Sequence, residues 1–221
     1  MGGSVLRITA PPDVGRQTQR RRILDAMIES CAEKTYAATT ISDIVARARI
    51  SRTTFYKQFE HKRDCFDAAV EYCLEELREV ARGAQGPEDE PGDAARLATT
   101  AVVKALAARP GLAQLLTGDA IAVDPAAIEH YRRMTIPALQ SLWARGNGNV
   151  ETRTDPRLAF GQAQVLILNQ IATGQAERLP ELLPELVYLA VCPFAGHDEA
   201  MRQARHARET ETGDATVGSD R

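Results

Sequence analysis

The sequence has no apolar run that approaches the ~18 residues needed to cross a bilayer. Its N-terminus also has no hydrophobic stretch suited to a signal peptide. We therefore expect a cytoplasmic chain with no membrane partner. The cysteines Cys31, Cys65, Cys73 and Cys192 show no CxxC pair and no zinc-ligand spacing. We expect them to be reduced core residues, and we expect no metal and no cofactor.

The sequence signatures of several enzyme classes are also missing. The chain has no HExxH, no GxSxG and no P-loop, and its four histidines are scattered. Asp124, Glu129 and Tyr131 could be posed as acid–base groups, but nothing in the sequence fixes their geometry. We predict that the chain is not an enzyme, and a helical enzyme is the weakest alternative.

Strand signals are scarce as well. Aromatic residues make up 5% of the chain, and apolar residues recur at spacings of three and four, which favours an all-α fold. Two short helices are predicted between residues 40 and 59. The other predicted helices lie near 16–34, 63–82, 94–109, 112–116, 128–145, 156–173, 185–191 and 198–208.

Charge is unevenly distributed along the chain. The net charge is −3, yet residues 16–62 hold ten Lys or Arg against five Asp or Glu. A basic N-terminal segment on an acidic remainder points to a polyanionic partner such as nucleic acid. A solvated helix face would give the same pattern.

Two helix starts lie only eleven residues apart in the segment TISDIVARARISRTTFYKQFEHK, residues 40–62. Thr40 and Asp43 form a capping-box-like pair, and Ser51 is a second N-cap. The spacing predicts two short helices joined by a tight turn near Arg49. Their core would contain Ile44, Val45, Ile50, Phe55 and Phe59. This is helix-turn-helix geometry.

The second short helix would expose a set of side chains suited to DNA. They are Arg52, Thr53, Thr54, Tyr56, Lys57 and Gln58. Arginine can bond guanine bidentately, and threonine can bond a base edge or touch a thymine methyl group. Tyrosine and lysine can reach phosphates, as can the free N–H groups of the helix that Ser51 caps. A helical hairpin whose polar face only meets water is the alternative at this point.

The pattern T-x3-I-V-x2-A-x-I-S-x2-T-F-Y-x2-F-x2-K, which runs from Thr40 to Lys62, resembles the DNA-binding domain of the TetR family. The resemblance spans about residues 18–75. It implies phosphate contacts from Thr40 and Lys62, base reading by Arg52, Thr53 and Thr54, and phosphate and groove contacts from Tyr56 and Lys57.

One position departs from the family pattern. The family usually has Gly in the turn where this chain has Arg49. If this residue is left-handed, a non-Gly side chain costs on the order of 1 kcal/mol. A phosphate contact from Arg49 could offset that cost.

A break rich in Gly, Pro and acid at 83–92 separates the basic segment and the helix that follows it from the rest. We predict a disordered arm at 1–15, a three-helix helix-turn-helix head at 16–62, a larger helical effector-binding and dimerisation body at 63–208, and a disordered tail at 209–221.

The resemblance also implies a homodimer through the last two long helices, here near 155–174 and 180–192. The stretch 159–172 is apolar almost all round, and such a helix must be covered on most sides. These helices could instead form the core of a single chain.

The body is expected to bind a small, largely apolar effector. The candidate contacts are Lys104, Tyr131, Met134, Trp143, Phe160, Gln164 and Asn169. Each such residue is more often core or surface than a ligand contact. Asn169 stands out because it lies within VLILNQIA, where a buried amide needs a partner. That partner could be the ligand or the other subunit.

The resulting expectation is a transcriptional repressor that its effector releases from a palindromic operator. An activator, or a regulator that needs its ligand to bind DNA, fits the same sequence. The main alternative is a helical interaction protein that binds every DNA sequence weakly and with the same salt dependence.

Overall fold

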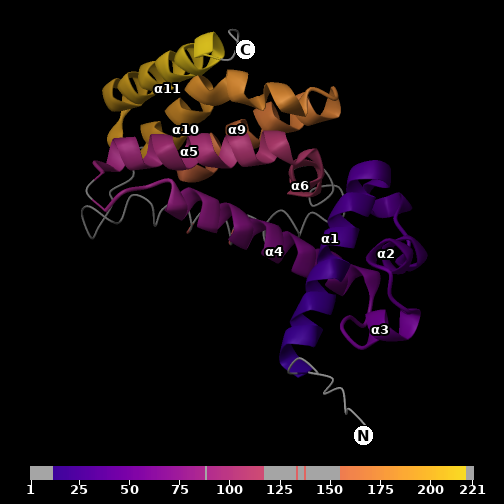
Figure 1. The fold of residues 1–221 in the computed structure, drawn as a ribbon. Helices are drawn as coiled ribbons and strands as arrows, with labels where there is room; N and C mark the ends of the chain where they lie inside the picture. The colour runs from indigo at the N-terminus through magenta and orange to yellow at the C-terminus, as the bar shows by residue number, and fades with distance from the viewer. Residues whose placement is uncertain (1–11, 88, 117–132, 134–136, 138–154, 218–221) are drawn as a thin grey trace, which may run out of the picture. The chain divides into compact units, whose positions relative to one another are not determined.

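A computed structural model describes residues 12–87, 89–116, 133, 137 and 155–217 (Figure 1). All regular elements in this part of the chain are helices, which confirms the predicted all-α class. None of the helices described is both long and apolar enough to cross a membrane.

The N-terminal helices are α1 (Pro12–Ala38), α2 (Ile41–Ala48) and α3 (Arg52–Tyr56), and α4 (Lys62–Gly83) follows them. The later helices are α5 (Pro91–Ala108), α6 (Pro110–Gln114), α9 (Pro156–Ala172), the 3-10 helix η2 (Ala176–Leu182), α10 (Leu183–Ala195) and α11 (His197–Val217). The break predicted at 83–92 therefore lies between α4 and α5.

The chain divides into two compact units, with the boundary inside α4 between Ala69 and Val70. The sequence placed this boundary at residue 62. The first two turns of α4 belong to the N-terminal unit because their apolar side chains are buried there. Phe66 is 1% exposed, and its ring centroid lies 4.4 Å from that of Tyr36 at the end of α1.

The core of the N-terminal unit is the apolar stripe of α1 packed on α2 and α3. Ile23 and Met27 are fully buried, as are Ile44 of α2 and Phe55 of α3. Each such side chain stabilises the fold by about 1.5–3 kcal/mol. Phe59 is buried as predicted, whereas Val45 and Ile50 are only half-buried.

In the second unit, α10 packs on both α11 and α5 (Figure 1). Leu186, Val187 and Val191 of α10 are buried there. Helix α9 also contacts α10, but none of its residues is buried, although its sequence is apolar on almost every side.

The first and last helices are longer than the sequence predicted. Helix α1 begins at Pro12 rather than at residue 16, and α11 continues to Val217 rather than ending near residue 208. An existing helix is extended at little cost because each added residue gains a backbone hydrogen bond. The helix predicted at 128–145 lies outside the described residues, apart from Arg133 and Pro137.

The capping box predicted at the start of α2 is present. The Thr40 hydroxyl accepts from the Asp43 N–H at 3.2 Å, and the Asp43 carboxylate accepts from the Thr40 N–H at 2.9 Å. Two backbone donors that the helix cannot use are thus satisfied.

The turn after α2 is closed by a Schellman motif. The Arg49 N–H donates to the Ala46 carbonyl at 3.2 Å, and the Ile50 N–H donates to the Val45 carbonyl at 3.0 Å. Arg49 is left-handed, with φ 53° and ψ 50°. A left-handed conformation at residue 49 was considered possible from the sequence, because the family pattern has Gly at this position.

Replacing Thr40 by Ala should lower the free energy of unfolding by about 1 kcal/mol, since α2 loses its N-cap. Thr40→Ser keeps the hydroxyl and should stay close to the unmodified protein. Urea denaturation followed by circular dichroism measures both. Equal stability of the Ala and Ser variants would contradict the capping role.

Arg49→Gly should raise the free energy of unfolding by about 0.5–1 kcal/mol, because Gly adopts the left-handed turn without a Cβ clash. Arg49→Ala removes the guanidinium but keeps the Cβ, so it should bring no such gain. The same denaturation experiment separates the two variants, and a Gly variant no more stable than the Ala variant would count against strain.

Candidate DNA-binding interface

Helix α3 is a single short helix held by one cap and one anchor. Ser51 is its N-cap, and its hydroxyl accepts from the Thr54 N–H at 3.1 Å. Phe55 is the one buried residue within α3, and its ring centroid lies 5.7 Å from that of Phe59. The cap sets where the helix begins, and the anchor sets which side faces the core.

With Phe55 inward, the predicted DNA-reading residues share the outer side of the motif. Those exposed are Arg49, Ser51, Arg52, Thr53, Tyr56 and Lys57, while Thr54 and Gln58 are half-buried. Tyr56 is 54% exposed, so both its ring and its hydroxyl are accessible to a partner. The structure therefore brings these predicted residues together, next to the α3 N-terminus.

The two arginines of this surface differ in how they are held. The Arg52 guanidinium donates to the Ser42 hydroxyl on α2, which holds the side chain along the α2–α3 face. The Arg49 side chain makes no hydrogen bond or ion pair with any residue that the structure describes. Arg52 is thus partly preorganised, whereas Arg49 can reach outward from its turn.

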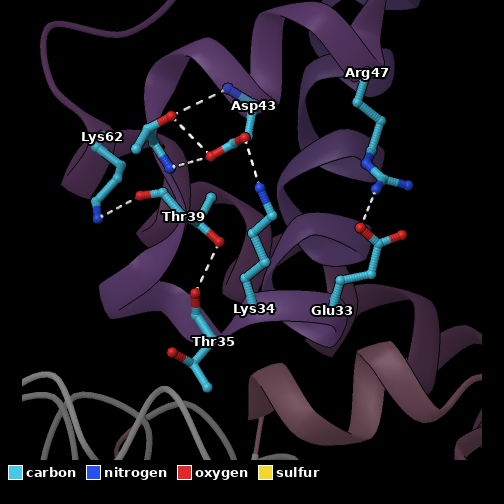
Figure 2. A network of polar contacts seen from close by, with 8 residues as sticks. Glu33, Lys34, Thr35, Thr39, Asp43, Arg47 and Lys62 are labelled. Atoms are coloured by element: carbon cyan, nitrogen blue, oxygen red, sulfur yellow. Dashed lines mark hydrogen bonds and ion pairs between the residues drawn. The ribbon is translucent and has the colours of Figure 1, made fainter.

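Lys62 has a structural role that the sequence did not predict (Figure 2). Its ammonium donates to the Tyr36 carbonyl at 2.9 Å and to the Thr39 carbonyl at 2.8 Å, and lies 4.1 Å from the Tyr36 ring centroid. These hydrogen bonds hold the segment that connects α1 to α2, which ends just before Thr40. A lysine in the first turn of a helix is unfavourable for the helix dipole. This unusual position was the feature of the sequence that could have indicated a structural role for Lys62. A phosphate contact from Lys62 stays a prediction.

Thr35 forms the other side of this link. It interrupts α1 with φ 68° and ψ 158°, a conformation that is strained for a β-branched residue. The Thr39 hydroxyl donates to the Thr35 carbonyl at 2.8 Å, and the Thr39 side chain is buried (Figure 2). Together with Lys62, this bond holds the chain where α1 ends and α2 begins.

Ion pairs join α1 to α2 on the exposed surface (Figure 2). Arg47 pairs with Glu33 and with Glu29, and Lys34 lies 2.8 Å from the Asp43 carboxylate. The hydrogen bond from Lys34, followed by those from Thr40, holds the pKa of Asp43 well below its usual value. Asp43 therefore remains charged at neutral pH. Exposed pairs of this kind orient helices more than they stabilise them.

Part of the basic charge of residues 16–62 braces the head itself. The Arg22 guanidinium donates to the Ala48 carbonyl at the end of α2, and the Arg20 guanidinium lies 4.5 Å from the Phe59 ring centroid. Lys34 and Arg47 are paired with acids. The charge asymmetry was a valid signal, but it counted these bracing residues together with those that face outward from α3.

Four of the predicted effector contacts lie in the described part of the chain, and they differ in exposure. Lys104 and Asn169 are exposed in the single chain, so a ligand or a second subunit as the partner of the Asn169 amide stays a prediction. Phe160 and Gln164 are half-buried, and the Gln164 Nε2 atom is buried without a hydrogen-bond partner in the described structure. Tyr131, Met134 and Trp143 lie outside the described residues.

An open groove of about 900 Å³ lies between α9, α10 and α11. Its lining includes Leu158, Gly161 and Val165 of α9, Tyr188 of α10 and Met201 of α11. Of the predicted effector contacts that the structure describes, Lys104, Phe160, Gln164 and Asn169, none lines it. The groove is mainly apolar and open to solvent, so it has the character of a docking surface more than that of an enclosed ligand cavity.

Residues 23–69 match the family model described as bacterial regulatory proteins, tetR family. No curated protein matches the chain. The matched range contains α2, α3 and the capping, turn and anchor residues described above.

Several solved structures share the fold. A fatty acid degradation regulator, FadR, from Bacillus halodurans has a TM-score of 0.67 at 19% identity, covering 86% of this chain and 100% of that one. FadR from Bacillus subtilis in complex with stearoyl-CoA has a TM-score of 0.66 at 20% identity, covering 79% and 98%. A gamma-butyrolactone receptor described as ArpA-like has a TM-score of 0.59 at 21% identity, covering 90% and 99%.

At these identities the structures establish the all-helical fold, and the family model identifies the head. The exposed polar face of α3, its Ser51 cap and its Phe55 anchor agree with both findings. The N-terminal part of the chain is therefore similar to bacterial regulatory proteins of the tetR family, and the chain shares the fold of the solved structures.

Proposed function

We propose that this regulator is a cytoplasmic homodimeric repressor that binds a palindromic operator through α3 and is released by a small, largely apolar effector. The observation that carries the proposal is the outward face of α3, on which Arg52, Thr53 and Tyr56 are exposed while Phe55 is buried. Two-fold symmetry would place the two recognition helices about 34–36 Å apart, one turn of DNA.

Within each half-site some of these residues would contact bases and others would contact the DNA backbone. Arg52 and Thr53 would read base edges, and half-buried Thr54 would touch a base or a thymine methyl group. Tyr56, Lys57 and Gln58 would contact the backbone or the groove wall, and Thr40, Arg49, Ser51 and Lys62 would contact phosphates. Arg49 is the strongest phosphate candidate of that last set, because no described residue pairs with it.

Arg52→Ala should reduce the preference for the operator over random DNA, since a bidentate base contact is worth about 1–3 kcal/mol of discrimination. The operator would first be selected from a random DNA pool, and affinities then measured by fluorescence anisotropy. Arg178→Ala is a matched control, because Arg178 is exposed on η2 and pairs only with Glu181 among the described residues. An unchanged preference in Arg52→Ala would reject the base-reading role.

Lys57→Ala and Arg49→Ala should weaken binding to operator and random DNA alike. Each should reduce the slope of log affinity against log salt by about 1, because one phosphate contact is lost. If the unmodified protein itself binds all sequences with one affinity and one salt slope, the alternative of DNA binding without operator specificity is correct.

The proposed dimer rests mainly on α9. Leu158 and Val165 are 68% and 65% exposed, and no residue of α9 is buried within its own chain. Helix α10 contributes less than the sequence suggested, because Leu186, Val187 and Val191 are buried inside the chain. The other relevant residues of α10 are Glu185, Tyr188 and Leu189, which line the groove beside α9.

Effector binding would release the protein from DNA through a movement of α4. This helix is continuous from the N-terminal unit into the second one. In the second unit its Glu76 lies 2.6 Å from the Arg109 guanidinium, at the junction of α5 and α6, and accepts from the Tyr72 hydroxyl at 2.9 Å. An effector that binds better to another arrangement of these helices would shift the population away from the DNA-binding form.

An apolar effector should stabilise the protein more as its chain lengthens, since each buried methylene contributes about 0.8 kcal/mol. The relative that was solved with stearoyl-CoA suggests acyl thioesters as the first series to test. Thermal unfolding with a graded acyl series and with free coenzyme A as control measures this. A Tm that does not depend on chain length would argue against an apolar site.

A catalytic role has little support. The relatives found are described as regulators or as a receptor. In the described part of the chain, no cluster of histidine, cysteine and acidic side chains could hold a metal ion.

A further inference from the structure

The exposed side of α9 has the spacing of a coiled-coil seam. The seam residues are Leu158, Gln162, Val165, Asn169 and Ala172, all exposed. They are separated by four, three, four and three residues, which is the a/d spacing of a heptad repeat. Such a stripe is suited to packing against another helix. We call these five residues the α9 seam.

The α9 seam is uncharged, and its polarity is symmetrical about its centre. Reading outward from Val165 in either direction gives an amide first and then an apolar residue. The side chains of Gln162 and Asn169 make no hydrogen bond with any residue that the structure describes. An amide carries both donors and acceptors, so it can pair with another amide across a symmetry axis, whereas a charged group cannot pair with its own kind.

We propose that two copies of α9 pack antiparallel across a two-fold axis at Val165, so that Gln162 hydrogen-bonds to the partner's Asn169. This inference rests on the proposed homodimer and specifies its register. Val165 meets the partner's Val165 at the axis, and Leu158 meets the partner's Ala172 at each end.

Side-chain size favours the antiparallel register over the parallel one. Antiparallel pairing places the long Leu158 opposite the short Ala172, and the long Gln162 opposite the short Asn169. Parallel pairing would set Leu158 against its own copy and Ala172 against its own copy, which crowds one end and leaves a gap at the other. Well-packed interfaces alternate large and small residues across facing positions.

The groove beside the α9 seam leaves room for the partner. Leu158, Gln162 and Val165 line it together with Gly161. A Cβ added at Gly161 would meet no atom within 4 Å. A Gly in mid-helix costs stability relative to Ala, and here it allows a second backbone to come close.

The register is tested by two double variants that share Asn169→Asp and differ only in the charge at residue 162. Gln162→Lys/Asn169→Asp places opposite charges in contact twice across the axis, so the dimer should persist. Gln162→Asp/Asn169→Asp places like charges in contact twice and should weaken the dimer by about a hundredfold or more. Within one chain the two positions are about 10 Å apart along the helix, so intrachain pairing affects neither variant strongly.

Sedimentation velocity of the full chain at a series of concentrations measures the dimer, and circular dichroism checks that both variants keep the same helix content. Retention of the dimer by both variants would show that another surface, or another segment of the chain, occupies the α9 seam. Dissociation of both would show that the helices are not paired in this register. Either result would overturn the proposed register without contradicting the proposal that the unmodified chain is a homodimer. A monomeric unmodified chain would contradict the proposed homodimer itself.

Discussion

The DNA-binding surface depends on the burial of Phe55. Helix α3 has five residues, and a helix of that length has no stability by itself in water. It exists because Phe55 is inserted into the core formed by α1 and α2 and because Ser51 satisfies its first free N–H groups. The same insertion decides which side chains remain outside. Presentation of Arg52 and Tyr56 is thus a consequence of packing, not of their own polarity.

The position of this core in turn depends on how α1 is linked to α2. Lys62 and Thr39 hold the link from one side, and the pair of Lys34 with Asp43 holds it from the other. These contacts are made by polar and charged groups. Hydrogen bonds and ion pairs are directional, whereas an apolar contact would not fix the angle between α1 and α2. The Lys34–Asp43 pair is exposed and adds little stability, whereas the hydrogen bonds of Thr39 and Lys62 are part-buried and satisfy backbone carbonyls at the link.

The body presents the opposite situation. Its α10 finds partners within the chain, whereas α9 has an apolar composition and no buried residue. The exposed apolar side chains of such a helix can be buried only by contact with another surface. The proposed dimer and the proposed DNA contacts would therefore depend on the same arrangement. In both, a helix anchors one side in its own domain and keeps the other side for a partner.

The local features of the head were determined by the sequence alone. The caps at Thr40 and Ser51 follow from interactions within a few residues, so spacing and residue type suffice to predict them. The left-handed turn at Arg49 was implied by the resemblance to the family pattern, and the inward position of Phe55 followed from its apolar spacing with Phe59. Tertiary structure decided the rest. Lys62 turned inward to backbone carbonyls 23 and 26 residues away, and Asn169, which its apolar neighbours made appear buried, faces outward. A helix that is apolar all round gives no direction by itself, because only the surrounding helices determine which of its sides is covered.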